Sequence, residues 1–201
     1  MSITIYSELQ TSVENWLGHT LFTARVPEFI ALFEATANRR LRTRQQETST
    51  TLTPRSGTAT LPADYLSWRR VTWSGSASLD LEYVQPAYLR AAYPTSPTDQ
   101  PRVFTIEGSS LLIRPIDSNN LDFDYYAKIA ALSDSNTTNW LLTAHPDLYL
   151  FGSLVEAEMF GVNDERAPSW KARRDEVFEE IQQLSNKTRG VGGIRVMGAT
   201  P

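Results

Sequence analysis

The sequence predicts an α+β protein in which helices from both ends of the chain form one helical bundle around an inserted, antiparallel β-rich module. Two observations predict this class: apolar residues recur at helical spacing near both ends, and threonine-rich, alternating segments fill the middle. The glycine-rich end of the chain predicts an extended C-terminal tail. The expected domains are a discontinuous bundle of residues 1–47 and 140–188, a β-rich module of residues 48–139, and a tail of residues 189–201.

The composition is that of a folded protein with a mild acidic excess. Hydrophobic residues make up 41% of the 201 residues, the formal net charge is −4 and the isoelectric point is about 5.3. General electrostatic binding to nucleic acid or to an anionic membrane is therefore not expected. The absence of cysteine excludes thiolate nucleophiles and Cys-based metal sites, and the two histidines leave only carboxylate sites for hard cations. No stretch has the pattern of a signal peptide or a membrane span, so we expect a protein used without export.

Two helices are expected before the β-rich module. Residues 6–18 carry a first apolar face, formed by Leu9, Val13, Trp16 and Leu17. The second helix is expected from Pro27, which suits a first helical position, to about Gln46. Its apolar stripe consists of Phe29, Ile30, Phe33, Ala37 and Leu41.

The middle of the chain reads as short strands separated by turns. Strands are expected on both sides of Ser56-Gly57 and of Ser74-Gly75, followed by a short helix from Gln85 that ends before Pro94 and a hairpin turning at Gly108. In the strand from Leu121, apolar side chains alternate with Asp122 and Asp124, so the two kinds should face opposite sides of a sheet.

The helical period returns after residue 139. His145, Pro146 and Asp147 raise the question of a catalytic His–Asp pair, but the chain has no G-x-S-x-G elbow to supply a nucleophile. Proline at the first helical position and a carboxylate near the positive end of the helix are typical of a helix start. We therefore predict a helix start that His145 flanks or caps. A last helix is expected through residues 164–189, with Trp170, Val177, Ile181 and Leu184 on one side.

Two groups of charged residues leave other functions open. The alternating acids Asp80/Glu82 and Asp122/Asp124 are typical of solvated strand faces, and the alternative is a carboxylate-dependent hydrolase in the β-rich module. The basic group is Arg39, Arg40, Arg42 and Arg44. These arginines suit a solvated helix end or ion pairs with a neighbouring subunit, and the alternative is a DNA-binding module that uses this helix.

Taken in order, several segments resemble the adaptor, or head-completion, proteins of tailed bacteriophages and gene transfer agents. The segments are VPEFIALFEATANRRLRTRQQ, LPADYLSWRRV, LEYVQPAYLRAAYP, FTIEGSSLLIRP, DERAPSW and, most characteristic, LDFDYYAKIAALSDSNTTNWLLTAHPDLYLFGSLVEA. None of them is a catalytic motif. The resemblance runs from about Ile5 to Arg189 and lies in the order of the segments.

The resemblance implies a structural virion protein without enzymatic activity or cofactor. Such proteins form a homo-oligomeric ring, usually twelve-fold, that binds below the portal protein, extends the DNA channel without sequence-specific contacts and receives the tail or its nozzle and stopper proteins. It implies the head–tail interface of the virion as location, with assembly in the host cytoplasm and no membrane. A C-terminal segment commonly reaches the portal, which here implies Arg189, Gly190, Val191, Gly192, Gly193, Ile194, Arg195, Val196 and Met197. Many copies acting together make weak contacts of this kind sufficient.

Overall fold

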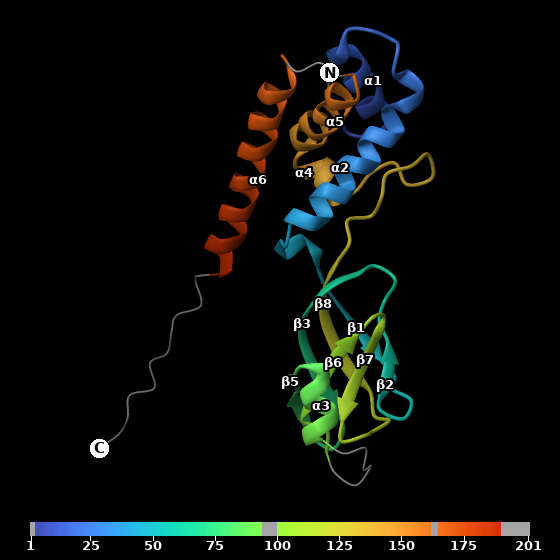
Figure 1. The fold of residues 1–201 in the computed structure, drawn as a ribbon, viewed down its shortest axis with the longest axis vertical. Helices are drawn as coiled ribbons and strands as arrows, with labels where there is room; N and C mark the ends of the chain where they lie inside the picture. The colour runs from blue at the N-terminus through green and yellow to red at the C-terminus, as the bar shows by residue number, and fades with distance from the viewer. Residues whose placement is uncertain (1–2, 94–99, 162–164, 190–201) are drawn as a thin grey trace, which may run out of the picture. The chain divides into compact units, whose positions relative to one another are not determined.

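The structure is a computed structural model that describes residues 3–93, 100–161 and 165–189 (Figure 1). In these residues it contains six α-helices, two 3-10 helices and two four-stranded sheets, which confirms the mixed α+β class. The chain divides into two compact units, residues 1–45 with 129–201 and residues 46–128. We call them the helical unit and the β unit, and each is described by itself.

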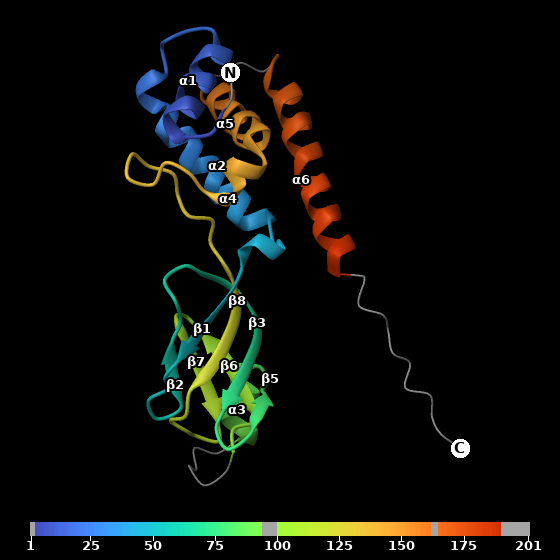
Figure 2. The ribbon, with the colours of Figure 1, turned by 180° about the vertical axis from the view of Figure 1, so that it is seen from behind.

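In the helical unit α5 packs against α1, α2 and α6 (Figure 2). α5 contains a run of fully or nearly buried residues on most of its circumference, including Leu148, Tyr149, Leu150 and Leu154, because neighbouring helices cover it on several sides. The described helices of this unit are α1 (Tyr6–Leu17), α2 (Val26–Arg40), α4 (Trp140–Ala144), α5 (Pro146–Phe160) and α6 (Ala167–Arg189).

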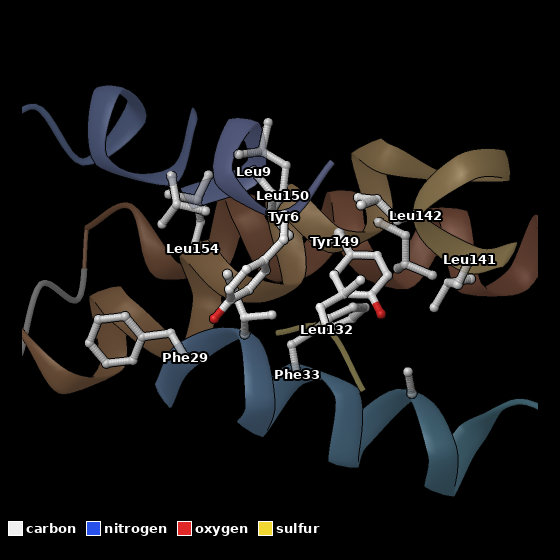
Figure 3. Close-up of a cluster of buried hydrophobic side chains, with 14 of the residues drawn as sticks. Tyr6, Leu9, Phe29, Phe33, Leu132, Leu141, Leu142, Tyr149, Leu150 and Leu154 are labelled. Atoms are coloured by element: carbon white, nitrogen blue, oxygen red, sulfur yellow. The ribbon is translucent and has the colours of Figure 1, made fainter. Parts of the chain in front are cut away.

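Buried side chains of α2 and α5 contact one another in the core of the helical unit (Figure 3). The rings of Phe33 and Tyr149 meet edge to face with centroids 5.0 Å apart, and both side chains are fully buried. A Cβ atom on Gly152 would overlap Cδ2 of Phe33. The absence of a side chain at position 152 is therefore what lets the Phe33 ring lie against the α5 backbone.

A buried polar network ties residues 129–139 to the helices. Oε1 of Glu34 accepts hydrogen bonds from the backbone N–H of Leu132 at 2.9 Å and from the Tyr149 hydroxyl at 3.0 Å. Asn139 donates to that hydroxyl at 2.6 Å and caps α4 by accepting from the N–H of Leu142. Burial raises the pKa of Glu34, although both hydrogen bonds that it accepts oppose the shift.

The second expected helix ends earlier than the sequence predicts. α2 stops at Arg40, and Leu41 is extended with φ −89° and ψ 135° before a 3-10 turn at Arg44–Gln46. The apolar period continues to Leu41, which is fully buried, so periodicity alone does not show the break. The chain leaves the helical path here because Glu47 begins a strand that pairs with the strand from Leu121.

The β unit consists of two sheets that share one core. The strands in chain order are β1 (Glu47–Leu52), β2 (Thr58–Thr60), β3 (Tyr65–Ser74), β4 (Ser78–Asp80), β5 (Glu82–Tyr83), β6 (Val103–Glu107), β7 (Ser110–Arg114) and β8 (Leu121–Ala127), with α3 (Pro86–Ala92) between β5 and β6. The sheet orders are β1-β8-β3-β4 and β2-β7-β6-β5. One buried cluster contains side chains from both sheets, such as Phe123 of β8 and Phe104 of β6.

Several details of the β-rich module are confirmed, and one is wrong. β6 and β7 form the predicted hairpin, in which Gly108 has φ +59°, and Leu121, Phe123 and Tyr125 are buried while Asp122 is exposed. The module is not purely antiparallel, because β5 pairs with β6 in parallel. A parallel pair needs a crossover connection, and α3 lies in the chain between these two strands.

Candidate functional site

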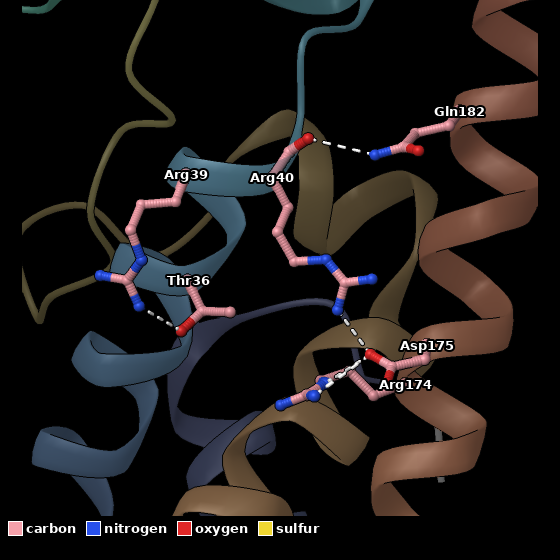
Figure 4. A network of polar contacts seen from close by, with 6 residues as sticks. All are labelled: Thr36, Arg39, Arg40, Arg174, Asp175 and Gln182. Carbon is pink, nitrogen blue, oxygen red and sulfur yellow. Dashed lines mark hydrogen bonds and ion pairs between the residues drawn. The ribbon is translucent and has the colours of Figure 1, made fainter.

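Arg40, at the end of α2, is bound within its own unit (Figure 4). Its Nη1 donates to Oδ1 of Asp175 on α6 at 2.5 Å, and its guanidinium carbon lies 4.1 Å from the centroid of the Phe178 ring. Its backbone carbonyl accepts from Nε2 of Gln182 at 3.1 Å. These three contacts fasten the last turn of α2 to α6.

Asp175 is held in its ionised form by the same contacts. Burial opposes this, but the hydrogen bond from Arg40 and the charges of Arg174 and Arg40 lower the pKa of Asp175 below its ordinary value. Arg174, which is buried, donates from Nε to the same carboxylate at 3.2 Å. The pair is therefore a structural contact of the helical unit.

The other three arginines lie in different surroundings. Arg39 is exposed and donates to Oγ1 of Thr36 at 2.8 Å, whereas Arg42 is half-buried and donates to the backbone carbonyl of Asn38. Arg44 is exposed and lines a cavity of about 450 Å³, together with Gln45, His145, Ile181, Leu184 and Ser185. The structure thus divides the predicted basic group into single side chains with separate environments.

His145 lies at the junction of two helices. It follows the last residue of α4 and precedes Pro146, the first residue of α5, and its side chain makes no capping hydrogen bond. Asp147 lies in the first turn of α5 and is exposed. The prediction of a helix start is confirmed, and His145 flanks it.

The predicted portal-binding segment falls almost wholly outside the described residues. Its first residue, Arg189, is the last residue of α6. Residues Gly190 to Met197 lie beyond the described part of the chain. Their role in binding the portal therefore stays a prediction.

The acids of the β unit belong to polar contacts across the strands. Asp124 accepts from Ser49 Oγ at 2.6 Å and from Arg70 Nε at 2.9 Å. The hydrogen bond from Ser49 and the guanidinium of Arg70 lower the pKa of Asp124, although partial burial opposes them. Asp122 accepts from Ser74 at 2.7 Å, and Asp80 accepts from Thr72 at 2.6 Å.

These contacts do not make Asp124 a candidate general acid. A general acid requires a carboxyl group whose pKa is raised, whereas Asp124 has a lowered pKa. Asp117 follows the same direction, because hydrogen bonds from Asn119, Ser118 and Trp73 outweigh the effect of burial on its pKa. Within the ranges that the structure describes, no group of three or more histidines and acids could hold a metal ion.

Sequence reasoning missed a groove on the helical unit. Its volume is about 440 Å³, and its lining residues are Trp16, Asp147, Phe151, Trp170, Arg173, Glu176, Val177 and Glu180. The sequence placed Trp16 and Trp170 on apolar helix faces, yet Trp16 is 45% exposed. The sequence shows these two tryptophans only as members of apolar helix faces, and it carries no signal that joins them to acids on other helices.

The comparisons with known proteins address the chain as a whole. The model of the SU10 adaptor protein family matches residues 4–196, which include nearly all of both units. A search of curated proteins finds no match. Among the described helices, none is long and apolar enough to cross a membrane. The extent of the family match shows that the chain belongs to the SU10 adaptor protein family of phage head–tail adaptors.

Proposed function

We propose that this adaptor assembles into a homo-oligomeric ring, a dodecamer in the virion, that binds below the portal protein. The ring extends the DNA channel and forms the platform on which the tail, or its nozzle and stopper proteins, dock. The observation that carries this proposal is the family match over residues 4–196, because it includes both units and the junctions between them.

The C-terminal segment Arg189 to Met197 is the proposed portal-binding element. The family match continues to residue 196, beyond the end of α6 at Arg189, so most of this segment belongs to the sequence pattern of the family. The segment contains Arg189 and Arg195 and no acid, and its apolar residues are Val191, Ile194, Val196 and Met197. A short apolar and basic segment suits docking into a groove or strand addition on a partner.

Arg39, Arg42 and Arg44 are the proposed contributors to contacts between subunits. Arg40 belongs to the same predicted set, but its ion pair with Asp175 gives it a role inside each subunit as well. Subunit contacts should therefore be tested at Arg39 and Arg44, whose substitution leaves that ion pair intact.

The mild acidity of the chain supports a conduit for DNA. The net charge is −4, and a channel wall that bound phosphates strongly would slow the passage of a polyanion. We expect weak, sequence-independent contact with the passing DNA.

The first test is mass photometry of the purified adaptor, alone and after mixing with the portal protein of the same phage. A mass increase of the portal by many adaptor copies is the expected result. If the mass of the portal does not increase at any salt concentration, the proposed ring below the portal is wrong.

The second test assigns the portal contact. A chain that ends at Arg189 should keep its helical circular dichroism and lose co-sedimentation with the portal. The matched control replaces residues 190–201 by a glycine–serine segment of equal length, which should behave like the truncation. Unchanged co-sedimentation of both variants would remove the segment from the proposal.

A further inference from the structure

The groove between α1, α5 and α6 combines an aromatic floor with an acidic rim. The rings of Phe151 and Trp170 are stacked, with centroids 5.9 Å apart and planes at 15°. Trp16 meets Trp170 edge to face at 5.3 Å. Surface clusters of this kind are typical of sites that bind another segment of protein, because aromatic side chains offer large contact area at little cost in side-chain entropy. We call this surface the acidic–aromatic groove.

The charge of the groove favours a cationic occupant. Asp147, Glu176 and Glu180 are exposed on its rim, and the guanidinium group that accompanies them, on Arg173, lies 3.5 Å from Oε2 of Glu176. Arg166 also lies over the Trp170 ring, with its guanidinium carbon 5.6 Å from the ring centroid. The three acids therefore outnumber the two neighbouring arginines, and the half-exposed Trp16 ring is the aromatic surface left for a cationic occupant. Carboxylates bind a guanidinium group by ion pairs, and tryptophan binds it through the face of the ring.

The α2 face of α5 is separate from this groove. At about 100° per residue, Asp147 and Phe151 lie roughly opposite Tyr149 and Gly152, which pack on Phe33 of α2. An occupant of the groove therefore leaves the α2–α5 core undisturbed. It also leaves the Arg40–Asp175 ion pair undisturbed, because neither residue lines the groove.

We propose that the acidic–aromatic groove holds residues 193–197 of its own chain until the portal is met. This segment reads Gly-Ile-Arg-Val-Met, and residues 189–201 contain Arg189 and Arg195 but no acid. Arg195 supplies the cation for the rim, and its apolar neighbours Ile194 and Val196 supply contacts for the aromatic floor. The proposal rests on the proposed function, in which the same segment binds the portal.

The geometry of α6 lets the segment return to its own groove. The helix between Glu180 and its end at Arg189 is about 14 Å long. Arg195 follows Arg189 by six residues, which span up to about 20 Å when extended. The groove side of α6, from Trp170 to Glu180, is about 15 Å long, and five extended residues cover about 17 Å. Docking within one chain therefore brings Arg195 to the Glu180 end of the groove, because the reversal of direction after α6 takes up part of the available length.

Docking of this kind makes the groove and the portal compete for one segment. A segment bound in the groove is not available to the portal, so the apparent affinity for the portal falls with the fraction of free segment. The many portal sites of one ring act together, which favours transfer once the first copies are bound. Variants that empty the groove should therefore bind the portal faster.

Because the chain has no cysteine, a single introduced cysteine can report the docking. We would label the full-length G198C chain with bimane, whose emission tryptophan quenches on contact. Quenching is expected in the labelled chain, and each of Trp16→Phe, Arg195→Glu and the pair Glu176→Lys/Glu180→Lys should relieve it. Combining Arg195→Glu with Glu176→Lys/Glu180→Lys should restore the quenching, because the charges of segment and groove are then complementary again. At about 1 M salt, where the Debye length is about 3 Å, quenching should weaken.

The matched control is Glu179→Lys, the same type of substitution on an exposed residue of α6 that does not line the groove, compared with Glu180→Lys alone; it should leave the quenching unchanged. Emission that is equal in the labelled chain and in all groove variants would overturn the proposal. Quenching that grows with protein concentration would also overturn it, because that result assigns the segment to a second copy.

The portal provides the link to function. Adding the portal should raise the bimane emission, and the Glu176→Lys/Glu180→Lys chain should associate with the portal faster than the unsubstituted chain. If the labelled chain binds the portal without any groove-dependent quenching, the docking is wrong while the proposed function holds. If quenching depends on the groove but the portal is not bound, the docking holds and the proposed function is wrong.

Discussion

The Tyr149 hydroxyl of α5 donates a 3.0 Å hydrogen bond to Oε1 of Glu34 of α2, and both side chains are buried in the helical unit. The same carboxyl oxygen accepts from the backbone of Leu132, while the side chain of Asn38, one turn further along α2, accepts from the backbone of Ile129. The side chains of Glu34 and Asn38 therefore bind the backbone N–H groups of Leu132 and Ile129, where the chain returns to the helical unit. Apolar packing alone cannot satisfy these groups, since a buried backbone N–H needs a hydrogen-bond acceptor.

Glu34→Gln should change how stability depends on pH. Burial raises the pKa of Glu34 above 4.5, so the folded chain holds a proton at pH values where the unfolded chain has released it. The free energy of unfolding of the unsubstituted chain therefore falls as pH rises from 4.5 through the raised pKa. Glutamine keeps the acceptor oxygen without the charge, so the variant should gain stability relative to the unsubstituted chain across that window.

Urea unfolding between pH 4 and 7.5 checks this, with Glu28→Gln as the control, since Glu28 is an exposed glutamate on the same helix. The prediction would be contradicted if the free energies of unfolding of Glu34→Gln and of the unsubstituted chain differed by the same amount at every pH in this range. Glu34→Ala should cost about 1–3 kcal/mol for each donor that it leaves unpaired.

Gly152→Ala should destabilise the helical unit by about 1–3 kcal/mol, because the new methyl group overlaps the fully buried Phe33 ring. Thermal unfolding followed by circular dichroism measures the effect. Phe33→Leu combined with Gly152→Ala should cost less than the sum of the two single changes, since the smaller side chain makes room. Additive costs would show that the two positions do not interact.

Arg40 and Asp175 should show a coupling free energy of about 0.5–1 kcal/mol in a double-mutant cycle of Arg40→Gln and Asp175→Asn. Both side chains are about one third exposed, which limits the strength of the ion pair. Urea unfolding at low salt and at about 1 M salt checks this, and the coupling should shrink at high salt. A coupling that does not depend on salt would assign the contact to packing on Phe178.

Asp124→Asn should destabilise the β unit at neutral pH by about 1 kcal/mol, because it weakens the hydrogen bonds from Ser49 and Arg70. The lowered pKa of Asp124 gives the sign of the pH effect: its contribution is present above the ordinary value of 3.8 and is lost as pH falls through the lowered pKa. The difference in free energy of unfolding between Asp124→Asn and the unsubstituted chain should therefore vanish at pH values below the lowered pKa of Asp124. Urea unfolding followed by near-UV circular dichroism and tryptophan emission, to which Trp68 and Trp73 of the β unit contribute, checks this, with the exposed Glu82→Gln as control.

The candidate surfaces were only partly accessible to sequence reasoning. The sequence places four arginines within six residues of one expected helix, but that helix ends at Arg40, so their side chains lie in different environments. The His145–Asp147 pair was interpretable from sequence because proline and a first-turn carboxylate act locally on a helix start. The acidic–aromatic groove was not, because it needs side chains from three helices that are distant in sequence.

The sequence by itself determined the mixed α+β class, the apolar faces of its helices, the alternation along β8 and the hairpin at Gly108, since these follow from periods and turn residues within short windows. Only the tertiary structure decided the end of α2, the parallel pairing of β5 with β6, the unit on which residues 129–139 pack and the burial of Glu34. The physical reason is that strand pairing and hydrogen bonds between distant residues compete with local preference, and in each of these cases the distant contact is the stronger one.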